Sequence, residues 1–104
     1  MRVAADTARF SHPEIEFGDV VYGPLHDIVG GGPARELCFT GRVVEAQEAK
    51  ALGLVSSVVP VAELAGEVKR FTDLIGRAPR DVLLRTKAKA IRRAAVVRDK
   101  TLDL

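Results

Sequence analysis

The chain has 104 residues, of which 47% are hydrophobic and 29% are charged. This composition is typical of one globular domain and excludes a disordered or fibrous chain. Its apolar runs are far shorter than the ~20 residues of a membrane helix, so we expect no membrane partner. A single cysteine, Cys38, cannot form an internal disulfide and is predicted to be a buried small apolar side chain. We expect a cytoplasmic location.

Charge is unevenly distributed along the chain. Residues 1–76 hold seven Lys/Arg and eleven Asp/Glu, whereas residues 77–104 hold nine Lys/Arg and three Asp. A basic end on an acidic body indicates either an anionic partner or a solvated helix face. The basic end has no interleaved aromatic residues, and the chain has no Trp and one Tyr. Base stacking is therefore not available there, and we expect no nucleic-acid partner.

Short elements separated by proline and glycine are predicted over the first 60 residues. Residues 2–5 and 8–12 read as strands, and Pro13 ends the second because it cannot donate to a ladder. The predictions that follow are a loop over 13–24, helices over 24–29, 33–39 and 45–52, a flexible turn at the glycines 30–32, and a strand over 54–59.

Two amphipathic helices are predicted after residue 60, each with one apolar stripe at helical spacing. The first stripe is Leu64, Val68, Phe71 and Ile75, and the second is Leu84, Ala88, Ile91 and Ala95. Pro79 separates the two helices and suits the first position of the second one. So short a link predicts a helical hairpin. The chain is thus divided into a core over 1–60 and a helical segment over 61–104.

The two histidines, His12 and His26, do not form a recognisable metal motif. No tight spacing joins them to the nearby carboxylates, so we expect no metal site. His26 and Asp27 are sequence neighbours whose side chains point apart on a helix, so they do not form a catalytic pair. His26 is predicted to be a packed or capping side chain.

Three stretches, taken together, resemble the enoyl-CoA hydratase/isomerase family, also called the crotonase family. The first is a predicted strand pair that ends in Phe-Ser-His-Pro-Glu-Ile at 10–15 and is followed by Gly18. The second is Phe-Thr-Gly-Arg at 39–42 followed by Ala-Gln-Glu-Ala-Lys at 46–50. The third is Leu-Gly-Leu-Val at 52–55 followed by Val-Val-Pro at 58–60. Their order and spacing are similar to those of the family's second half.

This resemblance implies an α/β fold, namely the C-terminal part of a crotonase-type ββα spiral followed by an α-helical hairpin that mediates oligomer contacts. It also implies an acyl-CoA thioester as substrate, with no bound cofactor. In the family, two backbone N–H groups form an oxyanion hole for the thioester oxygen, and glutamates move protons at the α and β carbons. Carried over by position, Glu14 is where hydratases place one of their two catalytic glutamates.

The chain also departs from the family pattern. The oxyanion-hole segments and the partner glutamate of the family precede the strand at 2–5, so we expect an N-terminal crotonase half to supply them. The stretch over 18–27 is shorter than the family's glycine-rich helix start, so ligand contacts are not carried over there. A layer of apolar surface is then left uncovered, and we predict that the isolated chain is marginally stable, oligomeric or partly molten.

Two functions follow as expectations. The first is an enoyl-CoA hydratase-like protein of fatty-acid β-oxidation, which hydrates trans-2-enoyl-CoA as a homo-oligomer or with an N-terminal crotonase half, and which is inactive without that half. The second is a non-catalytic remnant or interaction module that assembles with crotonase-family subunits. The preferred acyl chain, and the choice between hydration and double-bond isomerisation, stay open at this point.

Overall fold

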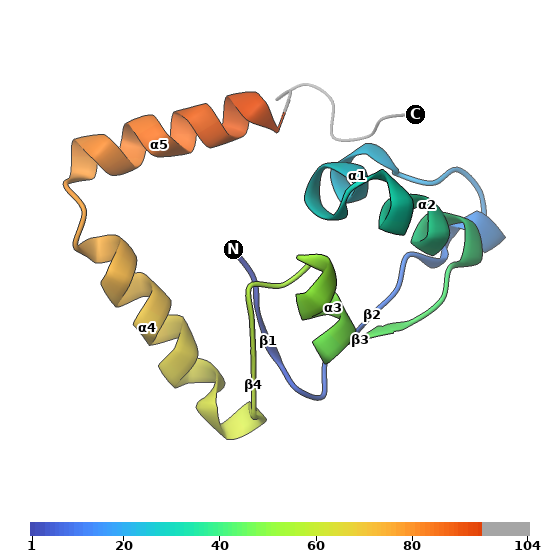
Figure 1. The fold of residues 1–104 in the computed structure, drawn as a ribbon, viewed down its shortest axis with the longest axis horizontal. Helices are drawn as coiled ribbons and strands as arrows, with labels where there is room; N and C mark the ends of the chain where they lie inside the picture. The colour runs from blue at the N-terminus through green and yellow to red at the C-terminus, as the bar shows by residue number, and fades with distance from the viewer. Residues whose placement is uncertain (95–104) are drawn as a thin grey trace.

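A computed structural model describes residues 1–94 (Figure 1). In that part of the chain, four short strands form two separate two-stranded sheets. The first strand, β1 (Val3–Ala5), pairs in parallel with β4 (Ser57–Val59). The second, β2 (Arg9–Phe10), pairs antiparallel with β3 (Val44–Glu45). Each predicted strand is confirmed in a shorter form, whereas β3 is too short to give a sequence signal.

The β1–β4 ladder ties the start of the chain to the end of the predicted core. Backbone hydrogen bonds extend this ladder beyond the strands, from Asp6 N to Val59 O at 2.8 Å and from Ser56 N to Arg2 O at 2.8 Å. Parallel strands need a long crossover connection. Here the crossover holds β2, β3 and the helices that carry the candidate site.

Four helical elements lie within this crossover. They are η1 (Pro13–Glu16), α1 (Gly23–Val29), α2 (Gly31–Thr40) and α3 (Ala46–Leu52). The loop predicted over 13–24 therefore contains a 3₁₀ helix, because Pro13 fixes a backbone angle that suits the first residue of a helix.

The flexible turn predicted at 30–32 is wrong for two of its three glycines. Gly31 and Gly32 are the first two residues of α2, and only Gly30, with φ of 84°, makes the turn between α1 and α2. A positive φ of this size favours glycine because it has no Cβ. At the other end of α2, Gly41 is a left-handed C-cap whose N–H donates to Leu37 O at 2.9 Å.

Small and β-branched side chains, together with Leu37, form the buried core between the strands, α2 and α3. The core cluster is Ala4, Leu37, Val44, Ala49 and Val55. Ala49 is fully buried, so α3 lies close to the strands that it covers. A core of so few large side chains buries little apolar surface, which limits the hydrophobic stabilisation of this fold.

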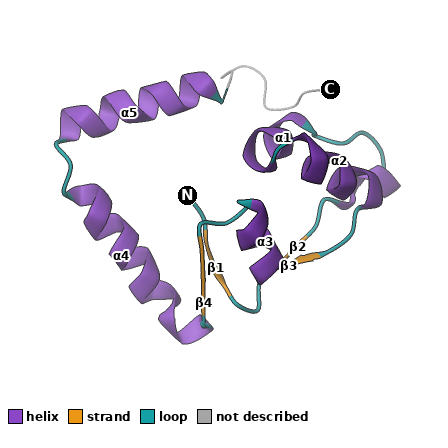
Figure 2. Cartoon of the chain, viewed as in Figure 1, coloured by secondary structure: helices purple, strands orange, loops and turns teal. Residues whose placement is uncertain are grey.

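The helical segment after the core consists of η2 (Val61–Glu63), α4 (Leu64–Gly76) and α5 (Arg80–Arg93). The two predicted helices are confirmed, and Pro79 precedes α5 as its N-cap. Figures 1 and 2 show that α4 and α5 meet at a corner and then point apart, so the hairpin is open. The boundary near residue 60, between the core and this helical segment, stays a prediction.

Neither α4 nor α5 contains a buried residue. Of the two predicted apolar stripes, Val68, Ile75, Leu84 and Ile91 are exposed, and Ala95 lies outside the described residues. The radius of gyration is 15.7 Å, compared with about 13 Å for a compact domain of about 100 residues. The open helix pair therefore leaves apolar surface that residues 1–94 do not cover.

Candidate functional site

Glu14 lies in the first turn of η1, which is separated from the end of β2 by two residues. Phe10 ends the strand, and Pro13 then begins the 3₁₀ helix. The backbone carbonyl of Glu14 accepts hydrogen bonds from Phe17 N at 2.8 Å and Gly18 N at 2.9 Å. These bonds fix the backbone of Glu14, so its carboxylate projects from a rigid position.

The Glu14 carboxylate has two unlike oxygen atoms. The side chain as a whole is 47% exposed, yet its Oε2 is buried and has no hydrogen-bond partner among the described residues. A buried acceptor without a donor costs about 1–3 kcal/mol of folding free energy. An unpaired carboxylate oxygen is also free to accept a proton or a hydrogen bond from a bound molecule.

His12 is the ionisable side chain beside this oxygen. Its Nε2 lies 3.7 Å from Glu14 Oε2 and 2.9 Å from the backbone oxygen of Val21. A carbonyl oxygen can only accept, so Nε2 carries a proton and donates it to Val21. His12 thus joins the start of η1 to the segment that leads into α1, and it orients the loop around Glu14.

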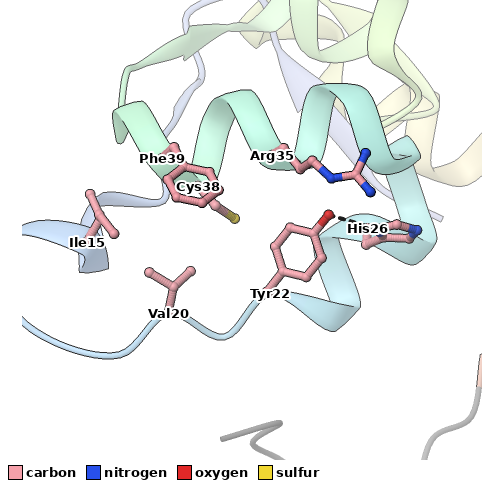
Figure 3. A pocket seen from close by; sticks show the side chains of 7 residues that line it. All are labelled: Ile15, Val20, Tyr22, His26, Arg35, Cys38 and Phe39. Atoms are coloured by element: carbon pink, nitrogen blue, oxygen red, sulfur yellow. Dashed lines mark hydrogen bonds between the residues drawn. The ribbon is translucent and has the colours of Figure 1, made fainter.

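An open pocket of about 400 Å³ lies between η1, α1 and α2 (Figure 3). Its apolar end is formed by Ile15, Val20, Cys38 and Phe39, and its polar end by Tyr22, His26 and Arg35. We call it the amphipathic pocket. Cys38 is buried, as predicted, and His26 is the packed side chain that the sequence indicates. Glu14 does not line this pocket.

Arg42 joins α2 to α3 through two carboxylates. Its guanidinium donates to Glu36 Oε1 at 2.7 Å and to both Glu48 oxygens at 2.7 and 2.9 Å. The hydrogen bonds to Glu48 first, and to Glu36 second, raise the pKa of Arg42 above its ordinary value. The same bonds lower the pKa of Glu48. Sequence reasoning missed this cluster, although a carboxylate six residues to each side of Arg42 is a readable signal.

A second polar cluster joins α4 to β4. The hydroxyl of the buried Ser57 donates to Glu67 Oε2, and Arg70 Nε donates to Glu67 Oε1 at 2.5 Å. Arg70 first, and Ser57 second, lower the pKa of the Glu67 carboxyl. The Arg70 guanidinium also lies 4.7 Å from the centre of the Phe71 ring. This cluster positions α4 without a buried side chain of its own.

Residues 1–94 lack two further kinds of feature. These residues contain no group of three or more His, Cys, Asp or Glu side chains that could hold a metal ion. No helix within the same range is long and apolar enough to cross a bilayer.

Comparison with known proteins gives one family. The family model for enoyl-CoA hydratase/isomerase matches residues 1–102. The chain is 38% identical over 81 residues to a short-chain-enoyl-CoA hydratase of Clostridioides difficile, a match of 74% of this chain and 52% of that protein. It is 40% identical over 78 residues to a crotonyl-CoA hydratase of Syntrophomonas wolfei, a match of 71% of this chain and 30% of that protein.

Solved structures of related enzymes have the same fold over most of the chain. A short-chain enoyl-CoA hydratase of Novosphingobium aromaticivorans superposes with a TM-score of 0.81 and 33% identity, over 93% of this chain and 40% of that chain. A monofunctional enoyl-CoA isomerase of Mycobacterium smegmatis superposes with a TM-score of 0.81 and 26% identity, over 92% and 47%.

The chain spans about half or less of the relatives that it matches. Both hydratases and an isomerase are among them, so the family is fixed more firmly than the reaction. The predicted crotonase-type α/β fold is confirmed by these structures. On the match of nearly its whole length to the family model, the chain belongs to the enoyl-CoA hydratase/isomerase family.

Proposed function

We propose that this chain supplies the Glu14 side of an acyl-CoA site, and that Glu14 moves a proton during the hydration of a trans-2-enoyl-CoA. The observation that carries the proposal is the state of the carboxylate. Glu14 Oε2 is buried without a partner among the described residues, on a backbone fixed by η1. A catalytic acid or base needs such a carboxylate in a fixed position and with an unused acceptor atom.

The proposed step adds water across the double bond of the thioester. The oxygen of water bonds to the β carbon, one proton of water passes to a carboxylate, and a proton is delivered to the α carbon. Glu14 is assigned one of these two transfers. The thioester oxygen gains negative charge as the water adds, and this charge needs oriented donors. We expect those donors, and the second carboxylate, to come from an N-terminal crotonase half outside these residues.

The hydratases among the relatives favour hydration over double-bond isomerisation in this proposal. The match to an isomerase structure keeps isomerisation as the alternative reaction at the same carboxylate. The acyl-CoA substrate, the location in the cytoplasm and the absence of a bound cofactor stay predictions.

Product analysis tests the proposal. The chain is assayed alone and co-produced with the N-terminal part of a related hydratase, with crotonyl-CoA and with a 3-enoyl-CoA as substrates. We expect 3-hydroxybutyryl-CoA from crotonyl-CoA in the co-produced complex. A 2-enoyl-CoA formed from the 3-enoyl substrate, without hydration, would assign isomerisation instead. A stable complex that forms neither product would contradict both reactions.

The open helix pair favours a second candidate function. Neither α4 nor α5 has a buried residue, and each exposes apolar side chains. We infer that this surface binds family subunits, so that the chain acts as an interaction module with or without its own chemistry. Co-purification with a full-length relative, in the absence of hydratase activity, would assign this function.

A further inference from the structure

We infer that the amphipathic pocket between η1, α1 and α2 binds an aliphatic monocarboxylate, with the carboxylate at Arg35 and the hydrocarbon chain along the apolar end. This inference goes beyond the proposed reaction and does not use Glu14. It rests on the chemistry of the two ends of the pocket and on the Arg35 guanidinium, which has no ion pair among the described residues.

The polar end of the pocket holds a positive charge that is not neutralised locally. Arg35 has no carboxylate within 4.0 Å among residues 1–94. In the same part of the chain, Arg42, Arg70 and Arg85 each form an ion pair with a neighbouring carboxylate. Figure 3 shows the Arg35 guanidinium directed toward the same end as Tyr22 and His26. A planar guanidinium binds a carboxylate through two parallel hydrogen bonds, so a carboxylate is the anion that suits it.

The start of α2 adds to this preference for an anion. The helix begins at Gly31, and a Cβ atom added there would be 2.9 Å from Arg35 Nη1 and 3.1 Å from His26 Cε1. The Arg35 and His26 side chains of the polar end therefore lie against the first turn of α2. The N-terminus of a helix carries partial positive charge, which stabilises a nearby anion.

A hydrogen-bond donor is also present at this end. Tyr22 Oη and His26 Nδ1 are 2.8 Å apart, and their rings contact edge to face at 5.4 Å between centres. Only one proton lies between these two atoms. If Tyr22 donates it, Nδ1 of neutral His26 accepts, and the single N–H of the ring is on Nε2. If His26 donates it, the Tyr22 hydroxyl keeps its own proton. In either arrangement one polar hydrogen of the pair is left for a ligand.

The other end of the pocket fits a hydrocarbon chain. Ile15, Val20, Cys38 and Phe39 come from three different segments and form its walls. Phe39 is 74% exposed although it is a large aromatic side chain. A bound aliphatic chain would cover part of this ring and gain free energy from the apolar area removed from water. The volume of about 400 Å³ lies within the range of about 300–1,000 Å³ that is usual for small-molecule sites.

Octanoate is the probe that tests this inference, and octan-1-ol is its uncharged counterpart. Both are titrated into the full chain by calorimetry. We expect saturable binding of octanoate, and binding of octan-1-ol that is weaker by about tenfold or more, as for the loss of a charged hydrogen bond. Tyr22 is the only tyrosine, and the chain has no tryptophan. A change in tyrosine emission on addition of octanoate therefore reports on the pocket itself.

Two arginine variants locate the charge. Arg35→Gln should weaken octanoate binding by about tenfold or more and leave octan-1-ol binding unchanged. Arg80→Gln removes the same charge from α5, away from the pocket. It should change neither the binding of octanoate nor the binding of octan-1-ol. Arg35→Lys keeps the positive charge but loses the planar guanidinium that donates two parallel hydrogen bonds. Its affinity for octanoate should therefore lie between those of the native chain and Arg35→Gln.

Several results would overturn the inference. They are equal binding of octanoate and octan-1-ol, unchanged octanoate binding in Arg35→Gln, and no saturable binding of octanoate. Burial of Tyr22 by a second copy of the chain, seen as emission that changes with protein concentration and not with octanoate, would do the same. Should Arg35→Gln fail to fold, the comparison of the two ligands on the unaltered chain decides.

Discussion

Gly41 lies directly against Pro13, because a Cβ atom added at Gly41 would be 3.4 Å from Pro13 Cα. Gly41 also has φ of 63°, a left-handed conformation that ends α2. Pro13 precedes Glu14 in the chain, so the C-terminus of α2 packs on the residue next to the candidate catalytic carboxylate. The stretches at 10–15 and 39–42, which both belong to the family pattern, thus meet in one contact.

Replacement of Gly41 by alanine should destabilise the fold. A side chain in the left-handed region costs about 1–2 kcal/mol, and the added methyl group presses on the Pro13 backbone. We expect the free energy of unfolding to fall by at least that amount, measured by urea denaturation. Gly66→Ala is the matched control, because Gly66 is inside α4 with open space around it. It should be neutral or stabilise by up to about 1 kcal/mol. Equal effects of the two substitutions would contradict the contact.

Acid should weaken the link between α4 and β4. Arg70 and Ser57 lower the folded-state pKa of Glu67. Glu67 therefore stabilises the fold above its unfolded pKa of about 4.3, and this contribution is lost as the pH falls through the lower, folded value. The stability difference between the native chain and Glu67→Gln should shrink as the pH falls from about 5 to about 3.

Urea denaturation at a series of pH values measures this difference. Glu63→Gln, at the end of η2, is the matched control, and its difference from the native chain should stay flat over the same pH range. A Glu67→Gln difference that is constant or that grows in acid would show that Glu67 is not held by its ion pair and hydrogen bond.

The open helix pair should drive self-association. Leu84 is 55% exposed and Ile91 is 44% exposed, and the two residues lie two turns apart on the same face of α5. Replacing both by glutamate removes the apolar contact and adds charge, so the associated fraction should fall in sedimentation equilibrium. Thr86→Glu with Ala90→Glu changes the charge of α5 equally and serves as control. A native chain that is monomeric and melts cooperatively at high temperature would contradict both this prediction and the expected marginal stability.

Local signals predicted most of the fold. Gly41, Gly53 and Pro79 lie at helix boundaries close to the predicted ones, because their backbone limits act within one turn. Pro13 instead begins a 3₁₀ helix where a loop was predicted. The strand β3 and the helical state of Gly31 were missed, because both depend on tertiary partners. Likewise the apolar stripes predict the two helices but not their relative direction, which depends on what covers them.

The candidate site was predictable only in part. The Pro-Glu pair at 13–14 gives the position of the carboxylate through the family resemblance, and the structure adds that its Oε2 is buried. The hydrogen bond from His12 to Val21 and the pocket that Arg35 and Tyr22 both line were not predictable, since each joins segments across a loop. No periodic pattern encodes such contacts.

The most direct test of the central claim is the rate of crotonyl-CoA hydration with the native chain, Glu14→Gln and Glu16→Gln. Each is measured in complex with the N-terminal part of a related hydratase. Glu16 belongs to the same 3₁₀ helix and is exposed, so its substitution controls for charge and for folding of η1. We predict that Glu14→Gln lowers kcat by about 10²–10⁴-fold, the usual contribution of a general acid or base, while Glu16→Gln retains the native rate. A Glu14→Gln complex that hydrates crotonyl-CoA at the native rate would contradict the assignment of proton transfer to Glu14.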